Sequence, residues 1–430
     1  GLANVGIGSS ALTANTTASG NVAVGTCAMR VNTTGANNTA VGTTALDVNT
    51  TGANGSAFGK SALAANTTGA SNVAVGYNAL LSNTTGGENT AVGWSSQGSN
   101  TTASSNSSFG NQSLCVNTTG CCNTSIGFRS MCSNTTGDNN VALGNNALSK
   151  NTSADSNTAV GHSALVLNTT GTRNVALGYN TLYANTTATD QVAIGHQTLD
   201  SATTGSENTA VGKSALATST SGATNVAVGA YALCKTTTSC CNVAVGYQAG
   251  ICNTTGLRNT YIGYRAGYNA TTPEGNTFVG RMAGCNAGTG NSNHAFGISS
   301  GIDAVKNITG TDTHQLVLGN NSTTNAFMKV SFTVTSDLRD KTEIEEVPHG
   351  LDFVNKLNPI KYRFKKTREN PIGTGNKKYG FSAQELLKLE GDNNVIIDNH
   401  DPENLKLTEL HLLPVLVNAI KELKAEIELL

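Results

Sequence analysis

Ser336 and Lys341 are the residues whose types and spacing best suit covalent chemistry. A serine hydroxyl needs a base before it can act as a nucleophile, and a lysine desolvated by packing can have its pKa lowered enough to accept the proton. Attack by Ser336 on the carbonyl of Thr335 passes through a five-membered ring, whereas attack on its own carbonyl needs a four-membered ring. A cut after Ser336 therefore requires another group or another protomer, and the sequence leaves the side of the cut open.

Asp337 and Arg339 complete the neighbourhood of the predicted cleavage site. Opposite charges two residues apart suit an ion pair that fixes a turn rather than a second catalytic pair. The alternative is purely structural: residues 335–341 form a capped turn at the start of a domain, and no bond is cut. A bare Ser–Lys pair does not separate the two interpretations.

The composition changes at this heptapeptide. Residues 331–430 hold 31 of the charged residues, although they are less than a quarter of the chain. The chain has 48 glycines and only 5% aromatic residues, which is little material for a large conventional core. A net charge of −1 without a basic run argues against nucleic acid as a partner. No apolar run approaches the ~20 residues that membrane insertion requires.

Glycine recurs every 17 residues from Gly8 to Gly297 without an insertion. A fixed period of this length is typical of a solenoid. The unit, as in Asn38–Asn54, begins with the strand-like Asn-Thr-Ala-Val-Gly and ends in turn residues. We therefore predict a mainly β fold in which residues 1–301 form a parallel β-solenoid or β-roll shaft, roughly 86 Å long at about 4.8 Å per coil.

Side chains in the strand-like part alternate in size. The residue before each repeated glycine is apolar, and the residue two positions before that is usually Val or Thr, so the two share one face. The position between them is small in every unit except those of Tyr261 and Phe278. We expect this small-residue face to admit another backbone, which favours side-by-side association of identical chains. From Gly246 onward glycine replaces the Leu of the Ala-Leu pair, which marks a variant sub-block.

Asn and Thr dominate the remaining positions of the unit. Asn lies four residues before the glycine in most units, and stacked Asn side chains can form amide ladders between coils. The Asn-Thr-Thr triplets match the glycosylation acceptor pattern, but repeated turns need the same residues, and we favour turns. The repeated threonines also raise the possibility of an ice-binding solenoid. Their position in the turn-like part of the unit argues against it.

The ten cysteines fall in shared registers of the repeat, as Cys115 and Cys132 do. Residues one coil apart are close enough for a disulfide, but parallel side chains give poor geometry, so we favour buried free thiols. No cysteine set has zinc-site spacing, and the acidic residues of the first 330 positions form no convincing pair for glycoside hydrolysis. We therefore predict no metal, no cofactor and no catalysis on external substrates.

The last part of the chain changes to a globular pattern. Residues 302–335 are interpreted as a connector with a final strand, and residues 336–430 as a small α+β domain. Within it we predict helices at 351–357 and 383–389 and strands at 360–364, 378–381 and 394–397.

Apolar residues near the C-terminus alternate at spacings of three and four, the pattern of a coiled-coil seam. The predicted trimerisation seam is Leu413, Leu416, Ile420, Leu423, Ile427 and Leu430. A helix of about 18 residues is too short to be stable alone, so its domain must support the assembly. The alternative is an amphipathic helix of the domain core.

Four ordered motifs in residues 336–430 resemble a known family. They are Ser336-Asp337-x-Arg339-x-Lys341-x-x-Ile344, Leu357 to Phe364, Gly380 to Glu385, and Leu412-Leu413-Pro414 with Ala419 to Leu423. Their order resembles the intramolecular chaperone auto-processing domain of phage endosialidase tailspikes and other tail fibres. The resemblance implies a domain that trimerises, templates folding of the shaft and cuts itself off, with Ser336 as nucleophile and Lys341 as general base.

The repeats of residues 1–301 resemble the head repeats of trimeric autotransporter adhesins, whose Asn-Ser-Val-Ala-Ile-Gly-type units form left-handed parallel β-rolls. The 17-residue spacing is longer than expected of those heads, so shared coil chemistry is the safer interpretation. Three parallel β-rolls and one interwound triple β-helix both stay open.

The solenoid pattern and the resemblance of residues 336–430 together imply a homotrimeric viral tail fibre or spike. Its shaft would recognise a host-surface receptor, a glycan or a surface protein, and its C-terminal domain would be a chaperone released after processing. We expect it on the virion surface or outside the cell, with an N-terminal anchoring part missing before Gly1. The alternatives are a cell-surface trimeric adhesin that is never cleaved and, less favoured, an ice-binding β-solenoid.

Overall fold

The structure, a computed structural model, divides into two compact units, Gly1–Gly319 and Asn320–Leu430. The described residues are 1–303, 306–323, 327, 329, 336–365, 371–391, 394–399 and 402–429. Thr335, Leu430 and most of the strand expected at the end of the connector lie outside them.

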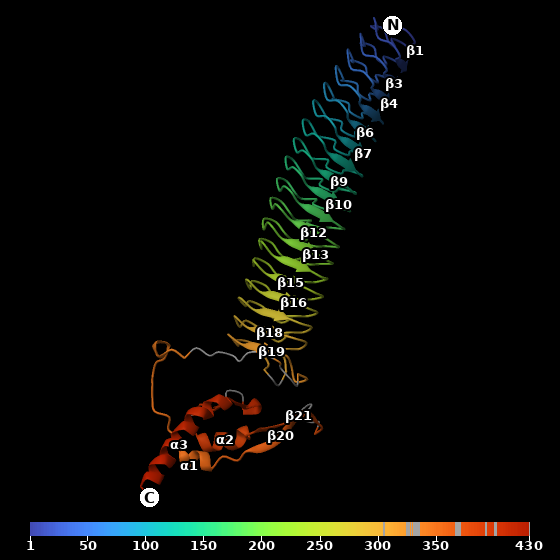
Figure 1. The fold of residues 1–430 in the computed structure, drawn as a ribbon. Helices are drawn as coiled ribbons and strands as arrows, with labels where there is room; N and C mark the ends of the chain where they lie inside the picture. The colour runs from blue at the N-terminus through green and yellow to red at the C-terminus, as the bar shows by residue number, and fades with distance from the viewer. Residues whose placement is uncertain are drawn as a thin grey trace. The chain divides into compact units, whose positions relative to one another are not determined.

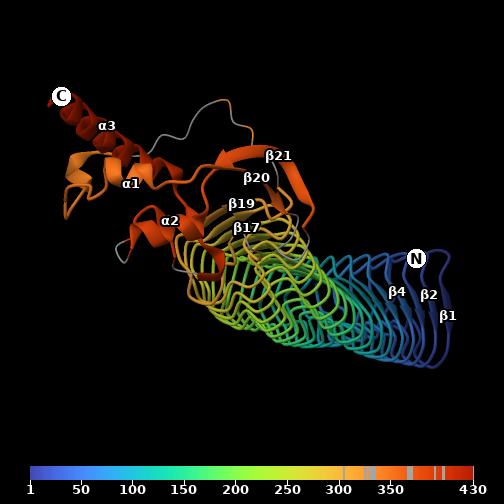
Figure 2. The same cartoon turned by 90° about the horizontal axis from the view of Figure 1, so that it is seen from below.

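The first unit is a parallel β-solenoid with one short strand in each coil (Figure 1). Each strand pairs in parallel with its neighbours in the chain, and Val22 faces Thr39, 17 residues later. Figure 2 shows the coils nested one behind another. The strands are β1 Val5–Ile7, β2 Val22–Val24, β3 Thr39–Val41, β4 Ser56–Phe58, β5 Val73–Val75, β6 Thr90–Val92, β7 Ser107–Phe109, β8 Thr124–Ile126, β9 Val141–Leu143, β10 Thr158–Val160, β11 Val175–Leu177, β12 Val192–Ile194, β13 Thr209–Val211, β14 Val226–Val228, β15 Val243–Val245, β16 Thr260–Ile262, β17 Thr277–Val279, β18 His294–Phe296 and β19 Leu316–Leu318. The predicted mainly β fold with a 17-residue-repeat parallel solenoid is confirmed.

A single chain completes each coil by itself. The backbone N–H of Thr39 donates to the carbonyl of Gly55, and that of Gly42 donates to the carbonyl of Val24, both at 2.8 Å. Neighbouring coils of one chain therefore satisfy one another's backbone groups. An interwound triple β-helix, whose neighbouring strands come from different chains, does not fit this shaft.

The repeated glycine forms the corner after each strand. Gly25 has a φ of 138°, a region that side chains disfavour, and a Cβ there would lie 2.5 Å from the carbonyl oxygen of Gly42 in the next coil. Both the turn and the close stacking of coils require glycine. This explains why the residue recurs without exception.

The interior of each coil holds the small strand residues, not the large ones. Ala40 is fully buried in a core cluster that also contains Leu46. Val41, the next residue, is 37% exposed. The expectation that the small-residue face associates with another chain is therefore wrong. That face is the inside of the chain's own coil, and the Leu side chains fill the space beside it.

Two aromatic rings replace the small strand residue near the end of the shaft. Tyr261 and Phe278 are fully buried, and their rings stack with centroids 5.8 Å apart. A Cβ at Gly250 or Gly267 would overlap the Tyr261 ring, and one at Gly284 would overlap the Phe278 ring. In this sub-block the aromatic ring therefore fills the space that the Leu side chain fills in the other coils, so the two substitutions occur together.

Two columns of Asn side chains connect the coils, as the predicted amide ladder requires. Asn21 Oδ1 accepts from the backbone N–H of Asn38 at 2.9 Å, and Asn21 Nδ2 donates to the carbonyl of Gly35 at 3.0 Å. In the Asn-Thr-Thr column, Asn49 Nδ2 donates to Asn32 Oδ1 at 2.8 Å. Asn32 and Asn49 are buried, which supports a role in the turn rather than glycosylation.

All ten cysteines are free, but only Cys285 is buried. Cys122 and Cys241 are exposed, and the others are partly exposed. The prediction of buried thiols is therefore wrong for most of them, because their registers lie on the outer parts of the coils.

The first unit extends beyond residue 301, where the sequence places the start of the connector. Leu316 of β19 pairs with His294 of β18, a spacing of 22 residues. Ile308 is buried, and a Cβ at Gly301 would contact it. The additional residues therefore form one longer coil, and the compact unit ends at Gly319.

The second unit has the α+β composition expected for the C-terminal domain. Its elements are the 3-10 helix η1 Leu338–Asp340, helix α1 Leu351–Asn355, strands β20 Ile360–Lys365 and β21 Gly373–Gly380, helix α2 Ala383–Glu390, strand β22 Ile397–Asp398, the 3-10 helix η2 Pro402–Asn404, strand β23 Lys406–Leu407, the 3-10 helix η3 Glu409–His411 and helix α3 Leu412–Glu428. β20 pairs antiparallel with β21, and β22 with β23. β21 begins earlier than residue 378, and β22 covers only the end of the strand expected at 394–397.

The core of this unit is small. It contains Phe353 of α1, Leu386 of α2, and Leu412 and Val415 of α3. α1 lies beside α3 (Figures 1 and 2). Helix α3 therefore has one face that belongs to the domain core.

Candidate functional site

A single turn of 3-10 helix brings Ser336 and Lys341 together. Asp337 caps η1 by accepting from the backbone N–H of Arg339 at 2.9 Å, and the backbone N–H of Lys341 donates to the carbonyl of Leu338 at 3.2 Å. This turn reverses the chain, so that Lys341 Nζ donates to Ser336 Oγ at 2.9 Å. The two side chains that the sequence predicts as nucleophile and base are therefore in direct contact.

Asp337 and Arg339 form an ion pair on the outside of this turn. Arg339 Nη2 lies 2.5 Å from Asp337 Oδ2, and Arg339 Nε lies 3.1 Å from both carboxylate oxygens. The hydrogen bonds from Arg339 lower the pKa of Asp337, and the carboxylate raises the pKa of Arg339. Neither side chain bonds to Ser336 Oγ among the contacts described. The pair holds the turn that positions Ser336 and Lys341.

The contact between Ser336 and Lys341 is exposed in the single chain. A charged lysine can only donate to a hydroxyl, whereas a neutral lysine at the same distance can accept its proton. Desolvation is what favours the neutral form of an amine. Thr335, whose carbonyl the predicted reaction attacks, lies outside the described residues.

The predicted seam residues lie on the exposed face of α3. Leu413, Leu416, Ile420, Leu423 and Ile427 are between 40% and 67% exposed. The opposite face, with Leu412, Val415 and Ala419, is buried against the domain. The structure thus gives α3 two apolar faces. One serves as core, as the alternative interpretation expected, and the seam face is left without a partner in the single chain.

An apolar groove continues the seam onto the rest of the domain. Its volume is about 400 Å³. Its walls are formed by Leu357, Pro359, Tyr379, Gly380, Phe381, Glu409, Leu410, Leu412, Leu413 and Leu416. The groove therefore joins part of the helical seam to residues of two sequence motifs.

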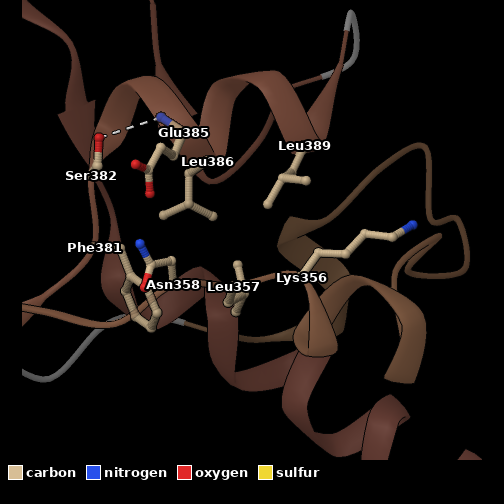
Figure 3. A pocket seen from close by; sticks show the side chains of 8 residues that line it. All are labelled: Lys356, Leu357, Asn358, Phe381, Ser382, Glu385, Leu386 and Leu389. Carbon is tan, nitrogen blue, oxygen red and sulfur yellow. Dashed lines mark hydrogen bonds between the residues drawn. The ribbon is translucent and has the colours of Figure 1, made fainter.

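A second pocket brings the same two motifs together on the side of α2 (Figure 3). In Figure 3, Leu386 points from α2 toward Leu357, and Phe381 and Asn358 overlap to one side of them. The volume of about 20 Å³ holds little more than one water molecule. Ser382 Oγ accepts from the backbone N–H of Glu385 at 3.4 Å and caps α2. This pocket is therefore a feature of packing and capping, not a ligand site.

Glu390 is a buried acidic residue that the sequence analysis did not identify. Its carboxylate accepts from the backbone N–H groups of Val395, Ile396 and Ile397, the last at 3.0 Å. Glu390 ends α2 just before Gly391, a pattern that normally indicates a solvated helix end. Nothing local in the sequence marks this residue as the support of the following loop.

The described residues provide no site for a metal ion among groups of His, Cys, Asp and Glu. Within the same residues, no helix has the length and apolar character needed to cross a membrane.

Comparison with known proteins gives one finding. Residues 336–395 match the family model described as chaperone of endosialidase. The match begins at Ser336 and ends before β22, so it includes neither α3 nor the repeats, whose resemblance to autotransporter heads stays a prediction. Comparisons with curated proteins and with solved structures gave no match. The segment from Ser336 to Val395 is similar to the chaperone of endosialidase family, which supports a phage tailspike-like protein with an intramolecular chaperone domain.

Proposed function

We propose that this chain is a homotrimeric tail fibre or spike that attaches a virion to its host. The solenoid is the shaft, and its exposed turns bind a glycan or protein on the host surface. The C-terminal unit directs trimerisation and folding of the shaft. It then cuts the chain next to Ser336 and leaves the shaft on the virion surface.

The observation that carries self-cleavage is the contact at the first residue of the family match. Ser336 begins the matched segment, and its Oγ lies 2.9 Å from Lys341 Nζ. In the step we favour, Ser336 Oγ bonds to the carbonyl carbon of Thr335 while Lys341 takes the hydroxyl proton. The bond from that carbon to the nitrogen of Ser336 breaks, and the nitrogen receives the proton. Water then hydrolyses the resulting ester to a Thr335 carboxylate and a free Ser336 hydroxyl.

Trimerisation is supported by the exposed seam of α3. The seam side chains cost free energy in water and would be buried by two further copies of the helix. Assembly would also lower the exposure of nearby side chains in the domain. Desolvation favours the neutral form of a lysine, the form that can take a hydroxyl proton.

The mass of the folded product tests the cleavage. Wild-type protein should lose a C-terminal fragment of 95 residues if the cut precedes Ser336, or 94 if it follows. Ser336→Ala and Lys341→Ala should abolish the loss, because each removes one partner of the contact. Ser322→Ala and Lys356→Ala, at exposed positions of the same unit, are the matched controls and should cleave normally.

The same measurement separates the alternatives. Intact wild-type chain under folding conditions would contradict self-processing and favour the permanently attached adhesin. Intact Lys356→Ala would mean that the lysine effect is not specific to the contact. Thermal hysteresis activity of the shaft would point instead to the ice-binding solenoid.

A further inference from the structure

We infer that the outward face of strands β1–β19 is the surface along which three shafts pack against one another. This face consists of the first and third residues of each strand, such as Val73 and Val75 of β5. The inference rests on the proposed trimer and adds to it the surface by which the shaft takes part. It also reverses the sequence-based expectation, which assigned this role to the small residues now found inside the coil.

The composition of the face suits contact with another protein surface. The first residues are Val, Thr or Ser in nearly all strands, and the third residues are Val, Ile, Leu or Phe. Phe58, Phe109 and Leu177 are each more than 40% exposed. A continuous apolar stripe of this kind is unusual on a protein surface that contacts only water.

Charge is excluded from the face along its whole length. None of the 19 strands contains Asp, Glu, Lys or Arg. The ion pairs of the solenoid lie in other registers, as Arg173–Asp190 and Arg258–Glu274 do. A surface that meets copies of itself around an axis cannot tolerate one repeated charge, because identical charges would be brought together. The absence of charge therefore fits self-association better than binding to a charged glycan.

The area of the face is large enough to contribute to contacts with two neighbouring copies. Nineteen strands at about 4.8 Å spacing are about 90 Å long, and three extended residues are about 10 Å wide, which gives roughly 900 Å² per chain. Around a threefold axis this area is divided between two neighbours, roughly 450 Å² each, so the face adds to the contact made by the seam of α3 and does not by itself reach the about 800 Å² per partner of a typical specific interface.

The repeat makes the faces of parallel copies match. Strand pairing is in register from coil to coil, so the large third residue recurs at each level of the solenoid. Copies whose C-terminal seams are joined run in the same direction, which places equivalent strands at the same height. We therefore assign the face to two further copies of this chain rather than to a receptor.

Photocrosslinking of the full chain tests the assignment. Phe109 lies on the face and is 41% exposed, whereas Tyr183 is 38% exposed outside the strands. Each is replaced in turn by p-benzoylphenylalanine, an aromatic of related shape, and the native mass of each variant is measured first. Irradiation should convert the Phe109 variant to covalent dimers and trimers and leave the Tyr183 variant monomeric on a denaturing gel.

The outcomes separate this inference from the proposed trimer. A monomeric native mass would contradict both. A trimer that crosslinks from position 183 and not from 109, or from neither position, would overturn the face and leave the trimer standing.

A second pair of variants tests the same face without a crosslinker, in case the crosslinker variants fold poorly. Val75→Asp would bring three carboxylates together, whereas Val116→Asp places the same charge at a similarly exposed position outside the strands. The shaft of the Val75 variant should melt at least several degrees lower than that of the Val116 variant. Equal melting temperatures would count against the face.

Discussion

The solenoid and the C-terminal unit solve the problem of burial in opposite ways. In the solenoid, Ala and Leu columns are fully buried, and each coil satisfies the backbone of the next. In the C-terminal unit, a small core coexists with a helix whose described seam residues, Leu413 to Ile427, are exposed. The shaft is therefore close to complete as a single chain, whereas the C-terminal unit exposes an apolar helix face that the proposed trimer would bury.

This difference suggests a division of labour between nucleation and durability. A solenoid coil contacts only its neighbours, so a first coil has nothing on which to stack and growth needs a template. Closing a 17-residue coil also costs entropy before its ladder bonds form. A domain that assembles first through its own seam can align three chains. In the function proposed above, the coils would no longer depend on that domain once they have formed.

Deletion of residues 336–430 should give the largest effect. We expect an insoluble shaft, because the chains lack the unit that aligns them. The measurement is the fraction of shaft in the soluble, trimeric pool, with uncleaved full-length Ser336→Ala as control. A soluble trimeric shaft made without these residues would remove the proposed chaperone role.

Ile420→Asp should abolish trimerisation of the full chain. Ile420 is 67% exposed on the seam, and three carboxylates there would repel one another in an apolar contact. Lys421→Asp places the same charge beside the seam and should keep the trimer. Sedimentation of the two purified variants measures the difference, and trimers of equal stability would show that α3 is not the seam.

Tyr261→Ala should destabilise the shaft locally, by about 3–5 kcal/mol, because it leaves a cavity between glycines that have no side chain to fill it. Tyr261→Phe is the matched control. The Tyr261 hydroxyl is buried without a hydrogen-bond partner among the described residues, so its removal should not destabilise and should stabilise slightly. Denaturant melts of the shaft compare the three proteins. A Tyr261→Phe variant that is less stable than the wild type would mean that the hydroxyl has a hydrogen-bond partner.

Glu390→Gln should have the smallest effect, about 1–3 kcal/mol on the C-terminal unit, because a charged acceptor of three backbone N–H groups is replaced by a neutral one. Glu385→Gln, on the same helix and more exposed, should change stability little. Urea unfolding of the Ser336→Ala chain gives both values. Equal midpoints for the two variants would show that the carboxylate is not the support of this loop.

The sequence was sufficient to predict the main features of both units. The period, the corner glycines and the turn residues predict a parallel solenoid because each coil must repeat one local conformation. The spacing of the α3 seam follows from helix geometry alone. Ser336 and Lys341 are separated by one turn, so a local element brings them together.

Tertiary structure decided which faces are inside. Alternation in a strand such as Thr39-Ala40-Val41 defines two faces but does not say which one the rest of the coil covers. The answer depends on Leu46, which returns to the Ala side and closes the core. Two other contacts are also made through space. The Tyr261 ring fills the space beside two glycines in different coils, and the Glu390 carboxylate binds the backbone of the loop after α2. Local pattern cannot specify them, because each depends on where distant parts of the chain arrive after folding.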